Sequence, residues 1–272
     1  MPFIDCHCHI DSPAFDVDRA QVLKNAKALG VEQMMIPGLH LSQFSELLSL
    51  KNDYSGTAYP RLDIAFGLHP YFLSENNIAG NIEHLLSKFC KYCTQYESSI
   101  VAIGEAGLDA KTPIDMQDQI AILVAQIDVA KVLGKPIVLH HRQSHNELIR
   151  VLKQKKFTGG GLIHAFSGSF EIAKTYVDMG FVLGIGGTIT YDRSQKTRKT
   201  LRRVYEELGD EHLVLETDSP DMPLFGFQGQ RNSPERIPLV AKALSRVLAV
   251  DIEHIALSTS KNYSRVFSSP TS

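Results

Sequence analysis

Histidine and acidic residues recur along this sequence in types and spacings that suit the binding of metal ions. Imidazole and carboxylate side chains without a thiolate favour Zn, Mn, Ni, Fe or Mg over a soft-metal centre. Two such ions bridged by one carboxylate lower the pKa of a shared water and stabilise the oxygens of a displacement. No serine or cysteine lies in a recognisable nucleophile elbow, so water is the expected nucleophile and hydrolysis the predicted reaction. The candidate residues of this kind are Asp5, His7, His9, His69, Glu105, His140, His141, His164 and Asp218.

The amino-terminal segment shows how one strand would present such ligands. Side chains alternate between the two faces of an extended strand, so Asp5, His7 and His9 are predicted to share one face. Two imidazoles with this spacing lie roughly 6.5–7 Å apart at Cα, close enough to bind one ion. The same alternation sends Cys6 and Cys8 outward, toward the covering helices. A zinc site that combines these cysteines with the histidines would need both faces, and we exclude it.

The elements that must position these residues follow a regular alternation of short apolar runs and longer stretches with helical periodicity. The predicted strands are residues 3–4, 33–36, 62–66, 100–103, 137–139, 161–163, 181–185 and 213–215. The predicted helices are residues 17–29, 44–50, 82–96, 115–133, 145–155, 171–179, 198–208 and 234–248. This order indicates a parallel sheet covered by helices.

The polar residues of catalytic type follow the carboxyl ends of these predicted strands. In a parallel barrel all such ends open on one face, where the loops build the active site. The pattern favours an α/β protein with a closed (β/α)8 TIM barrel, as a single domain over residues 1–272. An open doubly wound sheet is the alternative that periodicity alone leaves open.

Composition limits the class of protein. With 272 residues, 43% of them hydrophobic and a net charge of −2, the chain is neither disordered nor a basic nucleic-acid packing protein. No apolar run approaches the roughly 18–20 residues of a membrane-spanning helix, and the first residues lack a secretory signal. Cys6, Cys8, Cys90 and Cys93 are then expected to be reduced thiols, the last two within a helix. The sequence therefore predicts a cytoplasmic protein.

Several motifs in their order resemble the TatD family of metal-dependent hydrolases, which has an amidohydrolase-like barrel. The resemblance covers nearly the whole chain, and the segments after the eighth strand are similar to the YjjV-type branch. At residue 221 many other members carry an aromatic residue where this chain has Asp221, so their substrate preference does not carry over. The motifs are residues 4–9, 66–70, 104–109, 135–142, 164–169, 216–223, 226–229, 232–235 and 262–267.

The resemblance implies a site with two divalent ions, Zn, Mg or Mn. His7, His9 and Asp218 would hold one ion, and Glu105 would bridge it to a second. His140 and His164 would hold the second ion, whereas the neighbour of His140, His141, would point away from it. Asp218 and Glu105 are the implied catalytic residues, with Asp218 accepting a proton from the attacking water.

Other residues suit contacts with a substrate, although each also has a structural explanation. His69 and Arg142 lie beside the predicted ligands, where Arg142 suits either a phosphate or a structural ion pair. Phe225 and Phe227 would either stack on a base or close their loop onto the barrel. A group of glycines suits either a phosphate-binding loop or tight turns, and its members are Gly184, Gly186 and Gly187. A basic run would either steer a polyanion or form a solvated helix face, and it consists of Lys196, Arg198, Lys199, Arg202 and Arg203.

The leading functional hypothesis is a divalent-metal-dependent deoxyribonuclease that cleaves phosphodiester bonds, with 3′-exonuclease action on DNA as its expected form. One alternative is a hydrolase of another ester, an amide or a lactone, and another is a non-catalytic metal-binding scaffold. DNA or another phosphodiester is the expected partner. We expect a monomer with no membrane association and no obligate protein partner.

Overall fold

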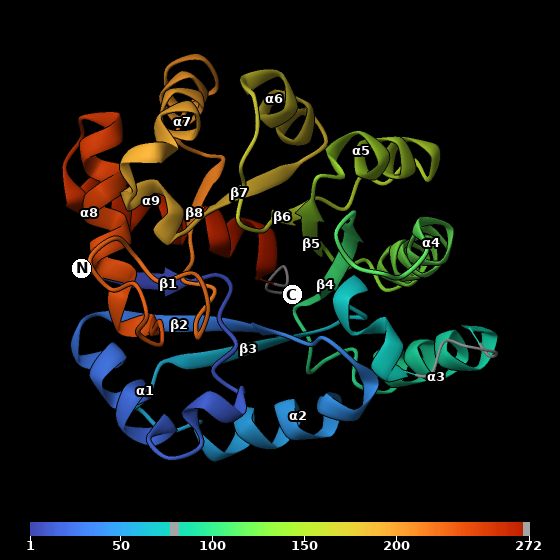
Figure 1. The fold of residues 1–272 in the computed structure, drawn as a ribbon. Coiled ribbons are helices and arrows are strands. Elements are labelled where there is room, and N and C mark those ends of the chain that lie inside the picture. Colours follow the sequence, from blue (N-terminus) through green and yellow to red (C-terminus); the bar gives the residue numbers. More distant parts are fainter. Residues whose placement is uncertain (77–81, 269–272) are drawn as a thin grey trace.

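The computed structural model describes residues 1–76 and 82–268 and shows a ring of parallel strands surrounded by helices (Figure 1). The strands pair in sequence order from the first to the eighth, and all of the pairs are parallel. The strands are β1 (Phe3–Asp5), β2 (Val31–Pro37), β3 (Arg61–Phe66), β4 (Ala102–Asp109), β5 (Ile137–Arg142), β6 (Gly161–Ile163), β7 (Phe181–Ile185) and β8 (Leu213–Leu215).

The helices are α1 (Arg19–Ala28), α2 (Phe44–Asp53), α3 (Ile82–Gln95), α4 (Met116–Val132), α5 (His145–Gln154), α6 (Phe170–Asp178), α7 (Gln195–Leu208), α8 (Ile237–Leu248) and α9 (Ile252–Phe267). Helices α1 to α8 alternate with the strands on the outside of the ring, and α9 follows α8 directly. Within the described ranges, no helix combines the length and the apolar character that crossing a membrane requires.

The ring is a nearly closed barrel. Between its first and last strands, the amide of Cys6 donates a hydrogen bond to the carbonyl of Leu215 at 2.9 Å. Because neighbouring strands are consecutive in sequence all round the ring, the (β/α)8 prediction is confirmed and the open doubly wound sheet is wrong.

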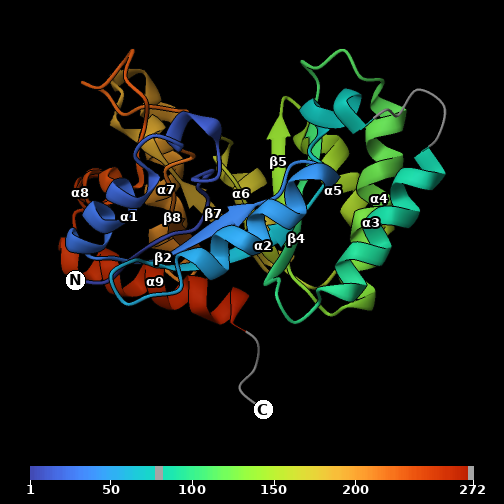
Figure 2. The same ribbon diagram turned by 90° about the horizontal axis from the view of Figure 1, so that it is seen from below.

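One layer of the core fills the barrel interior and is closed by the last helix. One side chain from each strand enters this layer: Ile4, Met35, Ala65, Ala102, Val138, Leu162, Val182 and Val214. Tyr263 and Phe267 of α9 pack against it, and the Tyr263 hydroxyl donates to Asp63 at 2.7 Å. Figure 2 shows α9 across the end of the barrel opposite to that toward which β5 points. Helix α9 was not among the predicted elements.

The structure corrects the predicted direction of Cys6 at the amino terminus. Cys6 packs with Ile4 in the interior layer, with its Sγ 3.9 Å from a Glu216 oxygen, and does not face the helices. The two-residue period itself holds from Ile4 to Cys6, and the prediction was wrong because this face of the strand points into the barrel rather than toward the helices. Cys8 is buried in the outer core, as predicted.

Strands β4 and β5 are longer than their predicted counterparts. Glu105 lies within β4 rather than after it, and His140, His141 and Arg142 form the last part of β5. Their placement on paired strands, with Gly107 opposite His140, fixes the relative position of these side chains.

Gly67 permits the close approach on which the position of Glu105 depends. A Cβ atom at residue 67 would lie 2.3 Å from the Gly104 carbonyl carbon and 2.4 Å from the Glu105 amide nitrogen. These contacts are with backbone atoms of β4, which cannot rotate away as a side chain can.

We therefore expect Gly67→Ala to lower the free energy of unfolding by about 1–3 kcal/mol, as overpacking does in protein cores. Urea denaturation followed by circular dichroism measures this loss. The matched control is Gly56→Ala, because a Cβ atom at the exposed residue 56 meets nothing within 4 Å. Equal stabilities of the two variants would contradict the role of this contact.

Candidate metal centre

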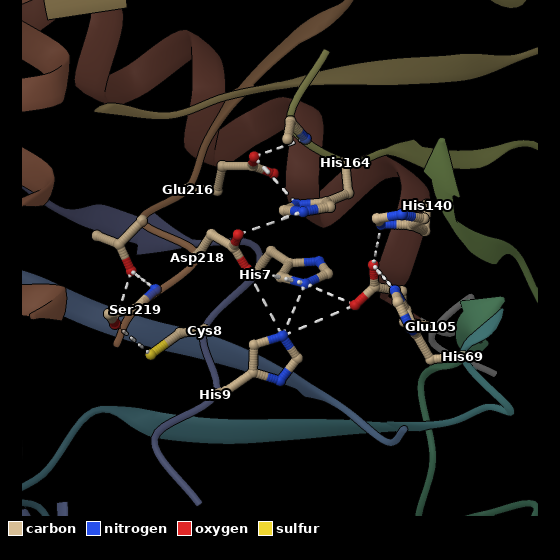
Figure 3. A network of polar contacts seen from close by, with 12 residues as sticks. His7, Cys8, His9, His69, Glu105, His140, His164, Glu216, Asp218 and Ser219 are labelled. Atoms are coloured by element: carbon tan, nitrogen blue, oxygen red, sulfur yellow. Dashed lines mark hydrogen bonds and ion pairs between the residues drawn. The ribbon is translucent and has the colours of Figure 1, made fainter. Parts of the chain in front are cut away.

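Side chains from both ends of the chain converge at the carboxyl end of the barrel (Figure 3). His7 and His9 follow β1, Glu105 comes from β4, and Asp218 follows β8. The Asp218 amide donates to the His7 carbonyl at 2.9 Å, and the His9 amide donates to the Ser219 carbonyl at 2.8 Å. These two hydrogen bonds hold the segments after β1 and β8 together.

Asp5 strengthens this junction without joining the cluster of imidazoles. Its carboxylate accepts hydrogen bonds from the Thr217 amide at 2.9 Å and the Thr217 hydroxyl at 2.6 Å. Burial raises the pKa of Asp5 to about 8. Asp5 thus fixes the residue directly before Asp218.

Four donor atoms lie around one point. The Nε2 atoms of His7 and His9 are 3.2 Å apart, and they lie 3.0 and 3.7 Å from Oε2 of Glu105. Oδ1 of Asp218 is 3.6 Å from each of the same two nitrogens. Atoms that share one ion at about 2.1 Å are separated by about 3.0–3.4 Å in octahedral or tetrahedral geometry, so this arrangement fits a first metal ion.

The second oxygen of Glu105 faces the opposite side. Oε1 lies 3.1 Å from Nδ1 of His140 and 3.3 Å from Nε2 of His69. The other ring nitrogen of His140 is 3.4 Å from Oδ2 of Asp109, a buried carboxylate of the same strand as Glu105. Glu105 therefore has one oxygen toward each of two imidazole pairs.

His164 joins this cluster through a pair of carboxylates. Its Nε2 lies 3.6 Å from Oδ2 of Asp218, while its Nδ1 lies 3.1 Å from Oε1 of Glu216. Its ring stacks on that of His7 at a centroid distance of 3.7 Å, whereas the centroid of His140 is 6.3 Å away. The three donors closest to one another around the second oxygen of Glu105 are thus His69, Glu105 and His140.

The donor set fits divalent cations on chemical grounds. Carboxylates lie together with several imidazoles that can bind a metal ion in their neutral form. Oxygen and nitrogen donors of this kind suit Zn, Mn or Mg. Buried charges require pairing or a metal ion, and the described residues place no Lys or Arg against these carboxylates. The residues present therefore fit the divalent metals that the sequence predicts.

The protonation states reflect the same crowding. Burial lowers the pKa of His7 well below its usual value and raises that of Asp218 to about 6. The pKa of Glu105 falls well below its usual value because the charges of His69 and His7 outweigh the effect of burial. For His164, the charges of Glu216 and Asp218 outweigh burial and raise the pKa to about 10. Glu105 is therefore ionised at neutral pH and available as a ligand.

The substrate residues predicted from the sequence lie in different places. His69 lines the pocket over the cluster, a hollow of about 570 Å³ that also reaches Tyr71 and Pro220. Arg142 is exposed at the end of β5 and is not among the residues that line this pocket. His141 points away, with its ring 4.0 Å from that of His145.

Two residues of the site were missed in the sequence. Asp109 and Glu216 each orient a histidine through the nitrogen that faces away from the centre, as acidic partners of metal-bound histidines do. Glu216 and Asp218 both follow β8, which ends at Leu215, so no strand period relates them in the sequence.

Two of the glycines at the seventh strand are required by close packing. Gly184 lies within β7, and a Cβ atom there would be 2.1 Å from Oε2 of Glu216. At Gly187 a Cβ atom would be 2.9 Å from the Met222 carbonyl. The first of these glycines leaves room for the carboxylate that orients His164.

Comparisons with known proteins agree with this geometry. A family model described as "TatD related DNase" matches residues 4–268. The chain is 35% identical over 270 residues to the uncharacterized metal-dependent hydrolase YjjV of Escherichia coli K12, covering 98% of each chain. The crystal structure of that TatD homolog superposes with a TM-score of 0.88 at 34% identity, covering 98% of each chain. The human protein named deoxyribonuclease TATDN3 is 30% identical over 97% of this chain and 94% of its own length.

We expect divalent metal to stabilise the fold through this cluster. A free ion at a hundred times its Kd adds about 2.7 kcal/mol to the free energy of unfolding. Thermal unfolding of the metal-free protein, titrated with Zn, Mn or Mg, measures the effect. His7→Ala should abolish most of the shift in Tm, whereas His254→Ala on α9 should keep it. An undiminished shift in the His7 variant would exclude this cluster as the binding site.

Glu216→Gln should weaken metal binding by about 10–100-fold, because loss of the carboxylate frees His164 to rotate. Competition with a chromophoric chelator gives the affinity for each bound ion. The control is Glu206→Gln, at an exposed position of α7. Unchanged affinity in the Glu216 variant, with an intact fold, would show that this carboxylate does not position the ligand.

Proposed function

The chain belongs to the TatD family of metal-dependent hydrolases, and on that basis we propose that it is a deoxyribonuclease that cleaves phosphodiester bonds. The observation that carries the proposal is the buried Glu105, whose two oxygens face imidazoles on opposite sides. This arrangement suits a pair of ions, and a pair of ions suits the in-line displacement at a phosphate. The human relative named a deoxyribonuclease supports DNA as the substrate.

The proposed ligands divide between two divalent ions, Zn, Mg or Mn. His7, His9 and Asp218 would hold one ion, His140 and His164 would hold the other, and Glu105 would serve both. When bound, the ions supply an activated water and stabilise the charge on the phosphate oxygens. His69, which faces the same oxygen of Glu105 as His140, is placed either to contact a phosphate or to complete the second set of ligands.

Asp218 is the proposed proton acceptor. One of its oxygens faces His7 and His9, and the other faces His164, so it lies between the two halves of the cluster. Its pKa of about 6 in the protein, raised by burial, lets it hold a proton more readily than an exposed aspartate does.

The pocket over the centre has room for a nucleotide. Its volume of about 570 Å³ falls within the usual range of small-ligand sites, and its wall carries His40, Tyr71 and Phe72. Aromatic side chains at the mouth offer surfaces on which a base can stack. Because the four cysteines are free and three of them are buried, we also propose a reducing compartment, the cytoplasm. We further propose that the protein acts as a monomer.

Asp218→Asn should reduce hydrolysis of DNA by about 10²–10⁴-fold, because the amide cannot accept the proton of the attacking water. Release of nucleotides from labelled single-stranded and duplex DNA measures the rate, and elemental analysis of the same sample measures bound metal. Asp53→Asn, at an exposed position at the end of α2, is the control.

The outcome on a panel of other substrates decides among the functions. A metal-loaded protein that releases no nucleotides but hydrolyses a lactone, an amide or another ester would overturn the nuclease proposal. If neither the parent nor Asp218→Asn hydrolysed anything on the panel while both kept their metal, a binding scaffold would be the better description.

A further inference from the structure

A second hollow, larger than the metal pocket, lies on the outside of the barrel between α7 and α8. Its volume is about 760 Å³, against about 570 Å³ for the pocket over the metal centre. Figure 1 shows these two helices side by side, and Figure 2 shows the same pairing from another direction. We call this hollow the basic groove, after the cations that line it: Arg198, Lys199, Arg202, Lys242 and Arg246.

The cations of the basic groove lie on facing sides of the two helices. Positions 198, 199 and 202 share one face of α7, and positions 242 and 246 share one face of α8, because residues three and four apart are neighbours on a helix. Asp192 is the one carboxylate that lines the groove in the described part of the chain. Like charges thus face each other across an open space in a protein whose net charge is −2.

Several of these charges are not used by the fold. Among the described residues, Lys199, Lys242 and Arg246 make no hydrogen bond or ion pair. Arg198 and Arg202 are held differently, since their guanidinium groups donate to the carbonyls of Ile189 and Val247. The arginines on α7 are therefore fixed in the wall, while the remaining cations are available to an anion.

An aromatic ring stands at the end of the basic groove. Phe225 is 58% exposed, although a ring of this size is normally buried. Its amide donates to the Thr190 hydroxyl at 2.8 Å, and its ring meets the edge of Tyr191 at a centroid distance of 5.8 Å. Phe225 is thus held in place from behind, with a face open to solvent.

One loop joins the basic groove to the metal centre. Asp218 and Asp221 line the metal pocket, and Leu224 and Phe225 line the groove. Three residues of chain span at most about 11 Å, so the rims at Asp221 and Leu224 are close. A polymer that occupies both hollows need only cross this loop, a distance of one or two nucleotides.

We propose that the basic groove binds the phosphate backbone of a single-stranded DNA whose terminal nucleotide lies at the metal centre, with a base stacked on Phe225. Unpaired cations along a groove, together with an exposed aromatic ring, are the combination that binds single strands without sequence preference. The inference rests on the proposed function, because the groove would hold the part of the substrate that is not being cleaved.

The test compares a groove variant with a matched control. Lys199→Ala/Lys242→Ala removes two unpaired cations from the groove, and Lys91→Ala/Lys153→Ala removes two exposed lysines from α3 and α5. Binding of a fluorescent single-stranded 12-mer is measured by anisotropy in chelator across a range of salt concentrations. Hydrolysis of the same strand and of a dinucleotide is measured with metal.

The groove variant should raise the Kd for the 12-mer about tenfold at low salt and reduce the slope of log K against log salt by about 1.4, or 0.7 per lysine. KM for the 12-mer should rise while kcat and the hydrolysis of the dinucleotide stay unchanged. The control variant should match the parent. A duplex of equal length should bind more weakly, because its bases cannot stack on Phe225.

This experiment gives different results depending on which of the two proposals is wrong. If the parent cleaves DNA and the groove variant matches it in Kd, salt slope and KM, the groove proposal is wrong and the nuclease proposal stands. If the parent binds the 12-mer through the two lysines but releases no nucleotides with any metal, the proposed nuclease activity is wrong and the groove is a binding site. A duplex that binds as tightly as the single strand, with the same lysine dependence, would overturn the assignment to single strands.

Discussion

The buried carboxylate of Glu105 imposes the main constraint on this structure. A charged group in the low-dielectric interior requires partners of opposite charge or a metal ion. Four histidines from three parts of the chain surround this carboxylate, with His7 and His9 at one oxygen and His69 and His140 at the other. Three features determine the surroundings of this side chain. They are the register of β4 with β5, the close approach of Gly67 to β4, and the position of the segment after β1. An error in any of these would leave a buried charge unpaired.

Much of the fold followed from periodicity, and the reasons for the exceptions are physical. The eight strands were located because each is a short apolar run, buried on both faces. The prediction for Cys6 was wrong because alternation shows which residues share a face but not which face points into the barrel, and Ile4 and Cys6 share the interior face. Helix α9 was missed although Ile255, Thr259 and Tyr263 are buried with a helical spacing. Its pattern lies after the last predicted repeat, where the barrel gives no expectation.

The candidate site was predictable in its ligands and less so in its supports. The histidines and acids stand out because they coincide with strand ends, which is a property of sequence order. Asp109 and Glu216 act only through contacts to ring nitrogens, and a sequence does not show which nitrogen of a histidine faces a carboxylate. The basic run likewise divides in space: Arg198, Lys199 and Arg202 line the groove, whereas Arg203 lies over Phe170 and pairs with Glu207. The net charge of the chain does not show which of these cations line the groove and which form ion pairs elsewhere.

The seam between the first and last strands has a consequence for the whole chain. The barrel closes there through the hydrogen bond from Cys6 to Leu215, and His7, His9 and Asp218 stand on the two sides of that seam. An ion held by these residues would cross-link two segments from opposite ends of the polypeptide. Long loops closed by such a link restrict the unfolded chain most. Loss of the ion would remove this link and leave the hydrogen bonds between the two sides of the seam to hold it closed.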